Sequence, residues 1–124
     1  MTTANDTMRR FLLIEGVAFI LAGLIHFGVG ITGYENSGAA RPEAVTGTVL
    51  LVALAVSWAF PAATRGLAIA AQAFALLGTL VGIYGIYLTI IGIGTSTVPD
   101  IAFNIGILLT LIAGLIVAVR GGRR

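Results

Sequence analysis

The chain has no cysteine and no lysine among its 124 residues, and it contains one histidine. Without cysteine it cannot form a disulfide, a thiolate metal site, an iron–sulfur cluster or a cysteine nucleophile. Charged residues make up only 10% of the sequence, whereas an ordinary soluble domain carries about 25%. No basic, water-exposed domain remains that could hold nucleic acid, so that class of partner is excluded.

Apolar side chains are abundant instead: 58% of the residues are hydrophobic, and there are 17 glycines besides. A water-soluble fold would expose more hydrocarbon than water tolerates, which makes the lipid bilayer the consistent solvent. A transmembrane helix needs about 20 mostly apolar residues. The sequence therefore predicts a single all-α, integral membrane domain over residues 1–124, a bundle of four transmembrane helices at about 11–33, 44–60, 66–94 and 101–119.

The arginines predict how these spans are oriented. Only Arg41 falls on one side of a four-span arrangement. The other six share the opposite side: Arg9, Arg10, Arg65, Arg120, Arg123 and Arg124. Because positively charged loops stay in the cytoplasm, we expect a multi-pass protein of the inner (plasma) membrane with both termini cytoplasmic.

Small residues recur along one face of three predicted spans. The candidates for close helix packing are Gly16, Gly23, Gly30, Gly78, Gly82, Gly106 and Gly114. Small side chains let helix backbones approach where no hydrophobic force drives the helices together. Such faces serve either the packing of the four helices within one chain or the interface of a homo-oligomer.

Two ionisable residues, Glu15 and His26, lie within the first predicted span. At about 100° and 1.5 Å per residue, they lie about 20° apart around the helix and about 16 Å apart along it. Ionisable groups at membrane depth nearly always face protein. Glu15 lies near the arginine-rich side, within reach of Arg10, Arg65 or Arg120. A buried ion pair is expected there, with Arg65 as the candidate partner.

His26 lies toward the opposite side, where Glu43, Asp100 and Asn104 also gather. A histidine among carboxylates can bind a ligand, relay protons or hold a divalent metal. The alternative is a neutral histidine with one hydrogen bond to a neighbouring helix. The sequence shows no serine-based triad and no H-E-x-x-H string, which argues against an enzyme. We therefore assign no catalytic residue and name no cofactor or metal.

Three segments resemble the DoxX-like superfamily of small four-span bacterial membrane proteins: Glu15–Phe27, Glu43–Gly47 with the apolar run that follows it, and Val119–Arg124. Members typically carry a basic residue at the position of His26. The resemblance implies a four-helix membrane fold and association with redox or stress-response partners, not one defined reaction.

Three functions remain as hypotheses. The small-residue faces favour an oligomerising accessory or scaffold subunit that packs against itself or another membrane protein. The polar cluster favours a small transporter, or a ligand- or metal-binding protein, with an outward-facing site around His26. An enzyme using Glu15 or His26 in acid–base chemistry on a lipid or isoprenoid is the third, although such a reaction generally needs an acid, a base and a positioned substrate.

Overall fold

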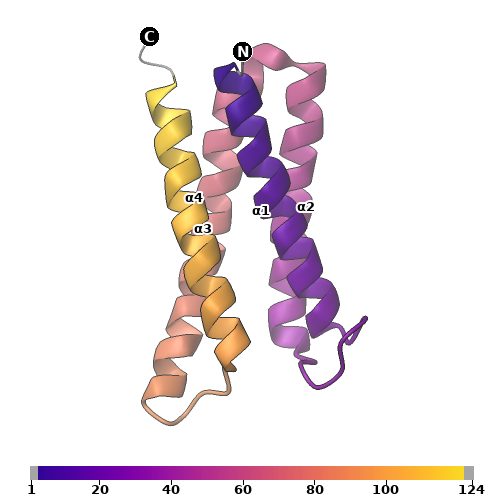
Figure 1. Ribbon diagram of the computed structural model, residues 1–124, viewed down its shortest axis with the longest axis vertical. Helices are drawn as coiled ribbons and strands as arrows, with labels where there is room; N and C mark the ends of the chain where they lie inside the picture. The colour runs from indigo at the N-terminus through magenta and orange to yellow at the C-terminus, as the bar shows by residue number, and fades with distance from the viewer. Residues whose placement is uncertain (1–2, 122–124) are drawn as a thin grey trace.

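A computed structural model describes residues 3–121 of the protein. It contains four long helices, α1 (Ala4–His26), α2 (Ser37–Ala59), α3 (Thr64–Ile90) and α4 (Val98–Arg120), and a short 3-10 helix, η1 (Pro61–Ala63). No strand occurs within residues 3–121, so the all-α prediction is confirmed. Both termini and η1 lie at one end of the bundle, here called the arginine end, and loops 27–36 and 91–97 lie at the other, the loop end (Figure 1).

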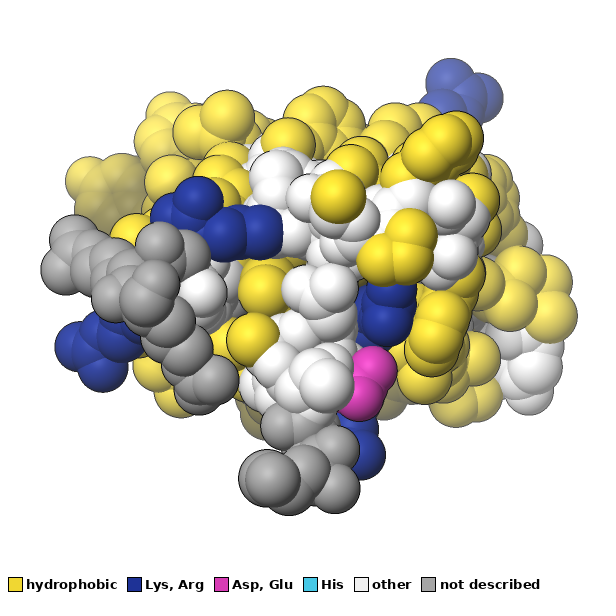
Figure 2. Space-filling view, turned by 90° about the horizontal axis from the view of Figure 1, so that it is seen from above, with side chains coloured by type: hydrophobic (Ala, Val, Ile, Leu, Met, Phe, Trp, Pro, Cys, Tyr) yellow, Lys and Arg dark blue, Asp and Glu magenta, His cyan; other side chains and the backbone are white. Residues whose placement is uncertain are grey.

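Three helices are long and apolar enough to cross a membrane: α2, α3 together with η1, and α4. The helix α1 is not in this group, so the prediction of four spans is supported only in part. Its first turns take in Asp6, Arg9 and Arg10, and Glu15 follows. Seen from the arginine end, arginine side chains lie at several separate places, some of them at the rim, and hydrophobic side chains cover much of the periphery (Figure 2). This distribution is consistent with lipid around the helices. Arg123 and Arg124, which also entered the orientation, lie outside the described residues.

The first helix ends at His26, although the sequence predicted that it would continue to Gly33. Gly28, Gly30 and Gly33 have φ angles of +90°, +83° and +97°, in the left-handed region that favours glycine. The chain therefore leaves the helix early and turns back. The backbone N–H of Asn36 donates to the carbonyl of His26 at 2.8 Å, which closes the loop between α1 and α2.

The second helix begins at Ser37, earlier than the predicted residue 44, because Asn36 caps it. The Asn36 side-chain oxygen accepts a hydrogen bond from the Ala39 N–H, a favourable arrangement at a helix start. Pro42 lies inside α2. Its missing N–H leaves the Gly38 carbonyl without its usual partner, and Gly38 is exposed at the end of the helix. The extension places Glu43 within a helix.

The third and fourth helices also differ from the predicted 66–94 and 101–119 at their ends. The third ends at Ile90, shortly before Gly92, which has a φ of +89°. The fourth begins at Val98, and its first turn is closed by Thr97 and Asp100. The Thr97 hydroxyl accepts from the Asp100 N–H, and the Asp100 carboxylate accepts from the Thr97 N–H. This reciprocal pattern is a capping box, with Thr97 as the N-cap and Asp100 at the third position of the helix.

The core is built from leucines and small residues. Leu12, Leu50 and Leu111 are fully buried, and alanines on α3 and α4 let the backbones approach. The helix α1 packs mainly on α2, whereas α3 packs on α4 and, almost as extensively, on α2. The two helix pairs diverge toward the loop end (Figure 1). There, Phe19 and Phe103 bridge them edge to face, with ring centroids 5.7 Å apart.

Two arginines at the arginine end satisfy the carbonyls that helix C-termini leave unpaired. Arg9 is buried and donates to the Ser57 hydroxyl and carbonyl at 3.1 and 2.7 Å, with its guanidinium 4.0 Å from the Trp58 ring centroid. Arg65 donates to the carbonyls of Ala118 and Val119 at 2.9 and 3.1 Å. Both side chains therefore connect two helices. The sequence analysis predicted a role for these arginines in membrane orientation but not this structural role.

The glycines divide into packed and unpacked positions. Gly16 faces Leu51, and a Cβ on Gly23 would lie 3.2 Å from the backbone nitrogen of Ala44. Gly78, Gly82 and Gly114 face Thr46, Asn104 and Gln72, respectively. A Cβ on Gly30 or Gly106 would meet nothing within 4 Å. These two glycines do not pack between helices of the described chain, because Gly30 lies in a loop and Gly106 faces outward; packing against a second copy stays a prediction.

Candidate functional site

The site centres on His26, the last residue of α1, at the loop end. The His26 Nδ1 lies 2.6 Å from Glu43 Oε2, and Nε2 lies 2.9 Å from Asp100 Oδ1. The three side chains come from α1, α2 and α4, and their exposed fractions are 10%, 13% and 23%. The structure therefore brings together three of the four residues that the sequence singled out and shields them from solvent. We call them the histidine triad.

The two contacts of His26 require a definite number of protons. A neutral imidazole donates from one ring nitrogen only, whereas an imidazolium donates from both. Each contact joins a ring nitrogen to a carboxylate oxygen, so each needs one proton between its two atoms. The triad thus holds two protons, either as an imidazolium with two carboxylates or as a neutral ring with one protonated carboxyl. In both forms its net charge is −1.

Further hydrogen bonds hold Asp100 in place. Its Oδ2 accepts from the Thr97 N–H at 2.9 Å and from the Thr97 hydroxyl at 2.8 Å, which leaves Oδ1 directed at His26. The Asn104 amide donates to the Asp100 main-chain carbonyl at 2.8 Å. Asn104, the fourth predicted residue, thus supports the helix turn that carries Asp100. Thr97, which the sequence analysis did not select, is the direct partner of the carboxylate.

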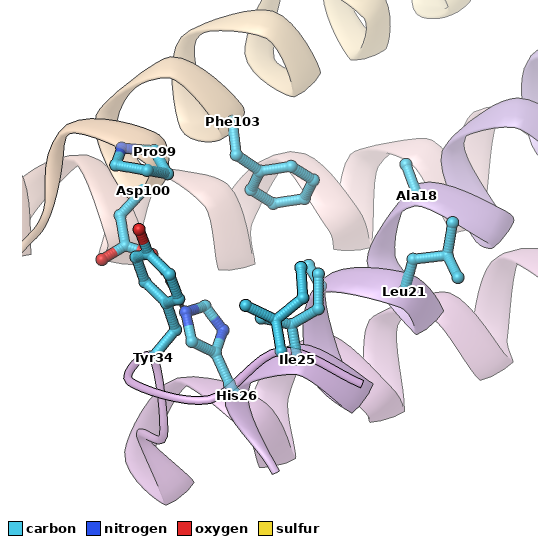
Figure 3. A pocket seen from close by; sticks show the side chains of 10 residues that line it. Ala18, Leu21, Ile25, His26, Tyr34, Pro99, Asp100 and Phe103 are labelled. Atoms are coloured by element: carbon cyan, nitrogen blue, oxygen red, sulfur yellow. Dashed lines mark hydrogen bonds and ion pairs between the residues drawn. The ribbon is translucent and has the colours of Figure 1, made fainter. Parts of the chain in front are cut away.

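A cavity of about 470 Å³ lies on one side of the triad, between α1 and α4. Its walls are apolar, with Ala18, Leu21 and Ile25 from α1 and Phe103 from α4. Figure 3 shows His26, Asp100 and Tyr34 close together at one end of this cavity, with the apolar side chains extending away from them. We call it the side cavity. It offers an apolar chamber with one polar, hydrogen-bonding end.

A second cavity, of about 280 Å³, lies on the inner side of the triad and is bounded by all four helices. It is more polar, and we call it the central cavity. Its lining includes Thr46 and Thr79 at depth and Asn104 and Ser96 nearer the loops. His26 borders both cavities, so the triad forms part of the wall between them.

No group of three or more histidine, aspartate or glutamate side chains within residues 3–121 is arranged to hold a metal ion. The reason is visible in the triad itself. Glu43 and Asp100 bind opposite nitrogens of the His26 ring, so each carboxylate uses the ring as its partner. The ring nitrogens that a metal would need are already engaged by the carboxylates.

The predicted ion pair between Glu15 and Arg65 does not form. The Arg65 guanidinium lies at the end of α4, on the carbonyls of Ala118 and Val119. Glu15 is fully buried, and neither of its carboxyl oxygens has a hydrogen-bond partner within the described residues. The prediction was wrong because arginine satisfies helix carbonyls at the surface without entering the bundle.

No protein-family model, no curated protein and no solved structure matches this chain. The similarity to the DoxX-like superfamily therefore stays a prediction from the sequence.

Proposed function

We propose that the protein is a four-span protein of the inner (plasma) membrane, with both termini cytoplasmic, which binds a small amphiphilic cation in the side cavity. It is thus a small transporter or a ligand-binding protein. The observation that carries this proposal is the side cavity itself, apolar along its length and closed at one end by His26 and Asp100.

Packing supports α1 as the fourth span. The helix α1 packs along α2, which is apolar enough to cross a membrane, and both helices extend between the arginine end and the loop end. A bilayer around α2, α3 and α4 therefore also surrounds α1. Its carboxylate at depth, Glu15, is fully buried and does not face lipid. The arginines at the end with both termini support a cytoplasmic position for that end.

Charge and ring chemistry support a cation as the ligand. The triad carries a net charge of −1 when its two hydrogen bonds are made. The rings of Tyr34 and Phe103 line the same cavity, and aromatic faces attract cations. The volume of about 470 Å³ falls within the range of about 300–1,000 Å³ for small-molecule sites. An amphiphile would place its apolar part against α1 and its charge beside Asp100.

Two ions of similar size and opposite charge test this proposal. Tetraphenylphosphonium is expected to bind the purified protein in detergent and to raise its thermal unfolding temperature, whereas tetraphenylborate is not. Ala22→Phe, which fills the side cavity, should abolish the effect. Val17→Phe on the exposed face of α1 is the matched control and should leave it unchanged. Equal shifts with both ions, or binding that survives Ala22→Phe, would refute a cation site in this cavity.

A second candidate function, an oligomerising accessory subunit, is favoured by the outer face of α4. Ala102 and Gly106 are exposed there and Thr110 is half-buried, and nothing lies within 4 Å of a Cβ on Gly106. These small residues leave a shallow surface on which the helix of a second copy could pack closely. Among residues 3–121, nothing packs against Gly106 on this surface.

Self-association can be measured directly. If α4 mediates it, light scattering in detergent will give the mass of an oligomer for the wild type and of a monomer for Gly106→Leu. Gly66→Leu is a control at another glycine whose Cβ would meet nothing within 4 Å, on α3, and should not change the mass. A monomeric wild type would exclude the accessory function through this face.

A further inference from the structure

Glu15 is a second polar site in the bundle, separate from the histidine triad. Its side chain is fully buried, and both carboxyl oxygens lack a hydrogen-bond partner within residues 3–121. In the same part of the chain, one other buried side-chain atom lacks a partner, the Oε1 of Gln72. If Glu15 is ionised, all three atoms can only accept hydrogen bonds, so a hydrogen-bond donor is missing from this region.

Gln72 of α3 lies near the part of α1 that carries Glu15. Gly114 of α4 lies directly against the Gln72 side-chain oxygen and against the ring of Phe11. Phe11 precedes Glu15 by four residues on α1, so the two share a helix face. The Gln72 nitrogen already donates to the Ala68 carbonyl at 3.0 Å, which fixes the amide and leaves its oxygen free.

No other titratable side chain on the helices lies at the depth of Glu15. The remaining ones lie toward either end: Asp6, Arg9, Arg10, Arg65 and Arg120 at the arginine end, and His26, Arg41, Glu43, Tyr84, Tyr87 and Asp100 at the loop end. The buried Arg9 is bonded to Ser57, and Arg65 is bonded to the end of α4. Therefore none of the helices α2, α3 and α4 provides a cation that pairs with Glu15. A buried charge without a partner is far less favourable than a neutral, hydrogen-bonded acid.

We propose that Glu15 is a buried proton-binding site, which holds its proton as a neutral carboxylic acid and donates it to the Oε1 of Gln72. One proton supplies the donor that this region lacks. The proposal is independent of the ligand in the side cavity, because Glu15 does not line that cavity.

The central cavity provides the route by which this proton exchanges. The cavity extends from His26 to Phe19 and Thr79. Glu15 lies one helical turn beyond Phe19 on α1, and Gln72 lies about two turns beyond Thr79 on α3. The edge-to-face pair of Phe19 and Phe103 stands at the floor of the cavity. Movement of this pair would connect Glu15 with the water and titratable groups of the loop end.

Infrared difference spectroscopy in lipid bilayers tests the protonation state. The carbonyl absorption of a neutral carboxylic acid should be present in the wild type and lost in Glu15→Gln. Glu35→Gln, at an exposed carboxylate of the loop between α1 and α2, is the matched control and should retain it. If the spectrum of Glu15→Gln loses a carboxylate absorption instead, the proposal is wrong.

Exchange in D₂O tests the route. The acid band of Glu15 shifts when its proton is replaced by deuterium, and the rate of this shift reports access. Phe19→Ala should accelerate the shift several-fold, whereas Phe74→Ala, at an exposed position on α3, should not. Phe103→Leu opens the same floor with a smaller change and replaces Phe19→Ala if that variant does not fold. Exchange at the wild-type rate in both floor variants would exclude this route.

Discussion

His26→Ala is expected to lower the free energy of unfolding by on the order of 3 kcal/mol. The substitution removes both donors at once and leaves two largely buried carboxylates, Glu43 and Asp100, without the ring that separates them. Repulsion between these groups then acts where α1, α2 and α4 meet. The loss should be smaller near pH 4, because carboxyl groups begin to protonate there and can donate the missing hydrogen bond. Thermal unfolding followed by circular dichroism at several pH values measures both effects.

His26→Gln provides the graded comparison. Its amide offers one donor group and one acceptor, so it can retain one of the two contacts and should unfold at an intermediate temperature. If His26→Ala unfolds at the wild-type temperature at neutral pH, the triad contributes nothing to the bundle. A loss that does not change with pH would show that lost packing, and not unpaired carboxylates, is responsible.

Gly47→Leu is expected to be at least as damaging, with a loss of about 3 kcal/mol or no folded protein. A Cβ at this position would lie 2.8 Å from Ile20 Cγ1 and 3.0 Å from the Gly16 carbonyl oxygen. The isoleucine can rotate, but the backbone oxygen cannot move without displacing α1. A leucine must therefore push α1 away from α2 and disturb the packing between them. The yield of folded protein and its unfolding temperature measure the effect.

Gly106→Leu is the matched control for stability. Its Cβ meets nothing within 4 Å, and leucine favours a helix more than glycine does by about 0.8 kcal/mol. This variant should fold with unchanged or slightly raised stability. Equal unfolding temperatures for Gly47→Leu and Gly106→Leu would contradict the close approach of α1 and α2 at Gly47.

Of the candidate site, the sequence predicted the members but not their arrangement. His26, Glu43 and Asp100 stand out as isolated polar residues near the ends of apolar segments, and such residues must find partners in a bundle. Both carboxylates bind one ring because α1 ends early and α2 starts early. These two helix ends depend on the left-handed glycines at 28–33 and on the Asn36 cap. A hydropathy pattern predicts neither feature.

The sequence also could not predict the partner of Glu15. Its distance along the helix placed Glu15 near the arginines, but a guanidinium can reach several helix carbonyls as easily as a carboxylate. Which of these it binds depends on how each helix is rotated about its axis. The close contact of Gly47 was missed for the same reason, because its sequence neighbours are ordinary apolar residues.

By itself, the sequence determined that the chain is helical and apolar and that its arginines gather at one end, because hydropathy and charge add up residue by residue along the chain. The tertiary structure alone decided which polar groups meet, where the two cavities lie and that Glu15 is buried away from Arg65. Those outcomes depend on the relative rotation and depth of helices that are far apart in sequence, and they are set by the packing of the whole bundle.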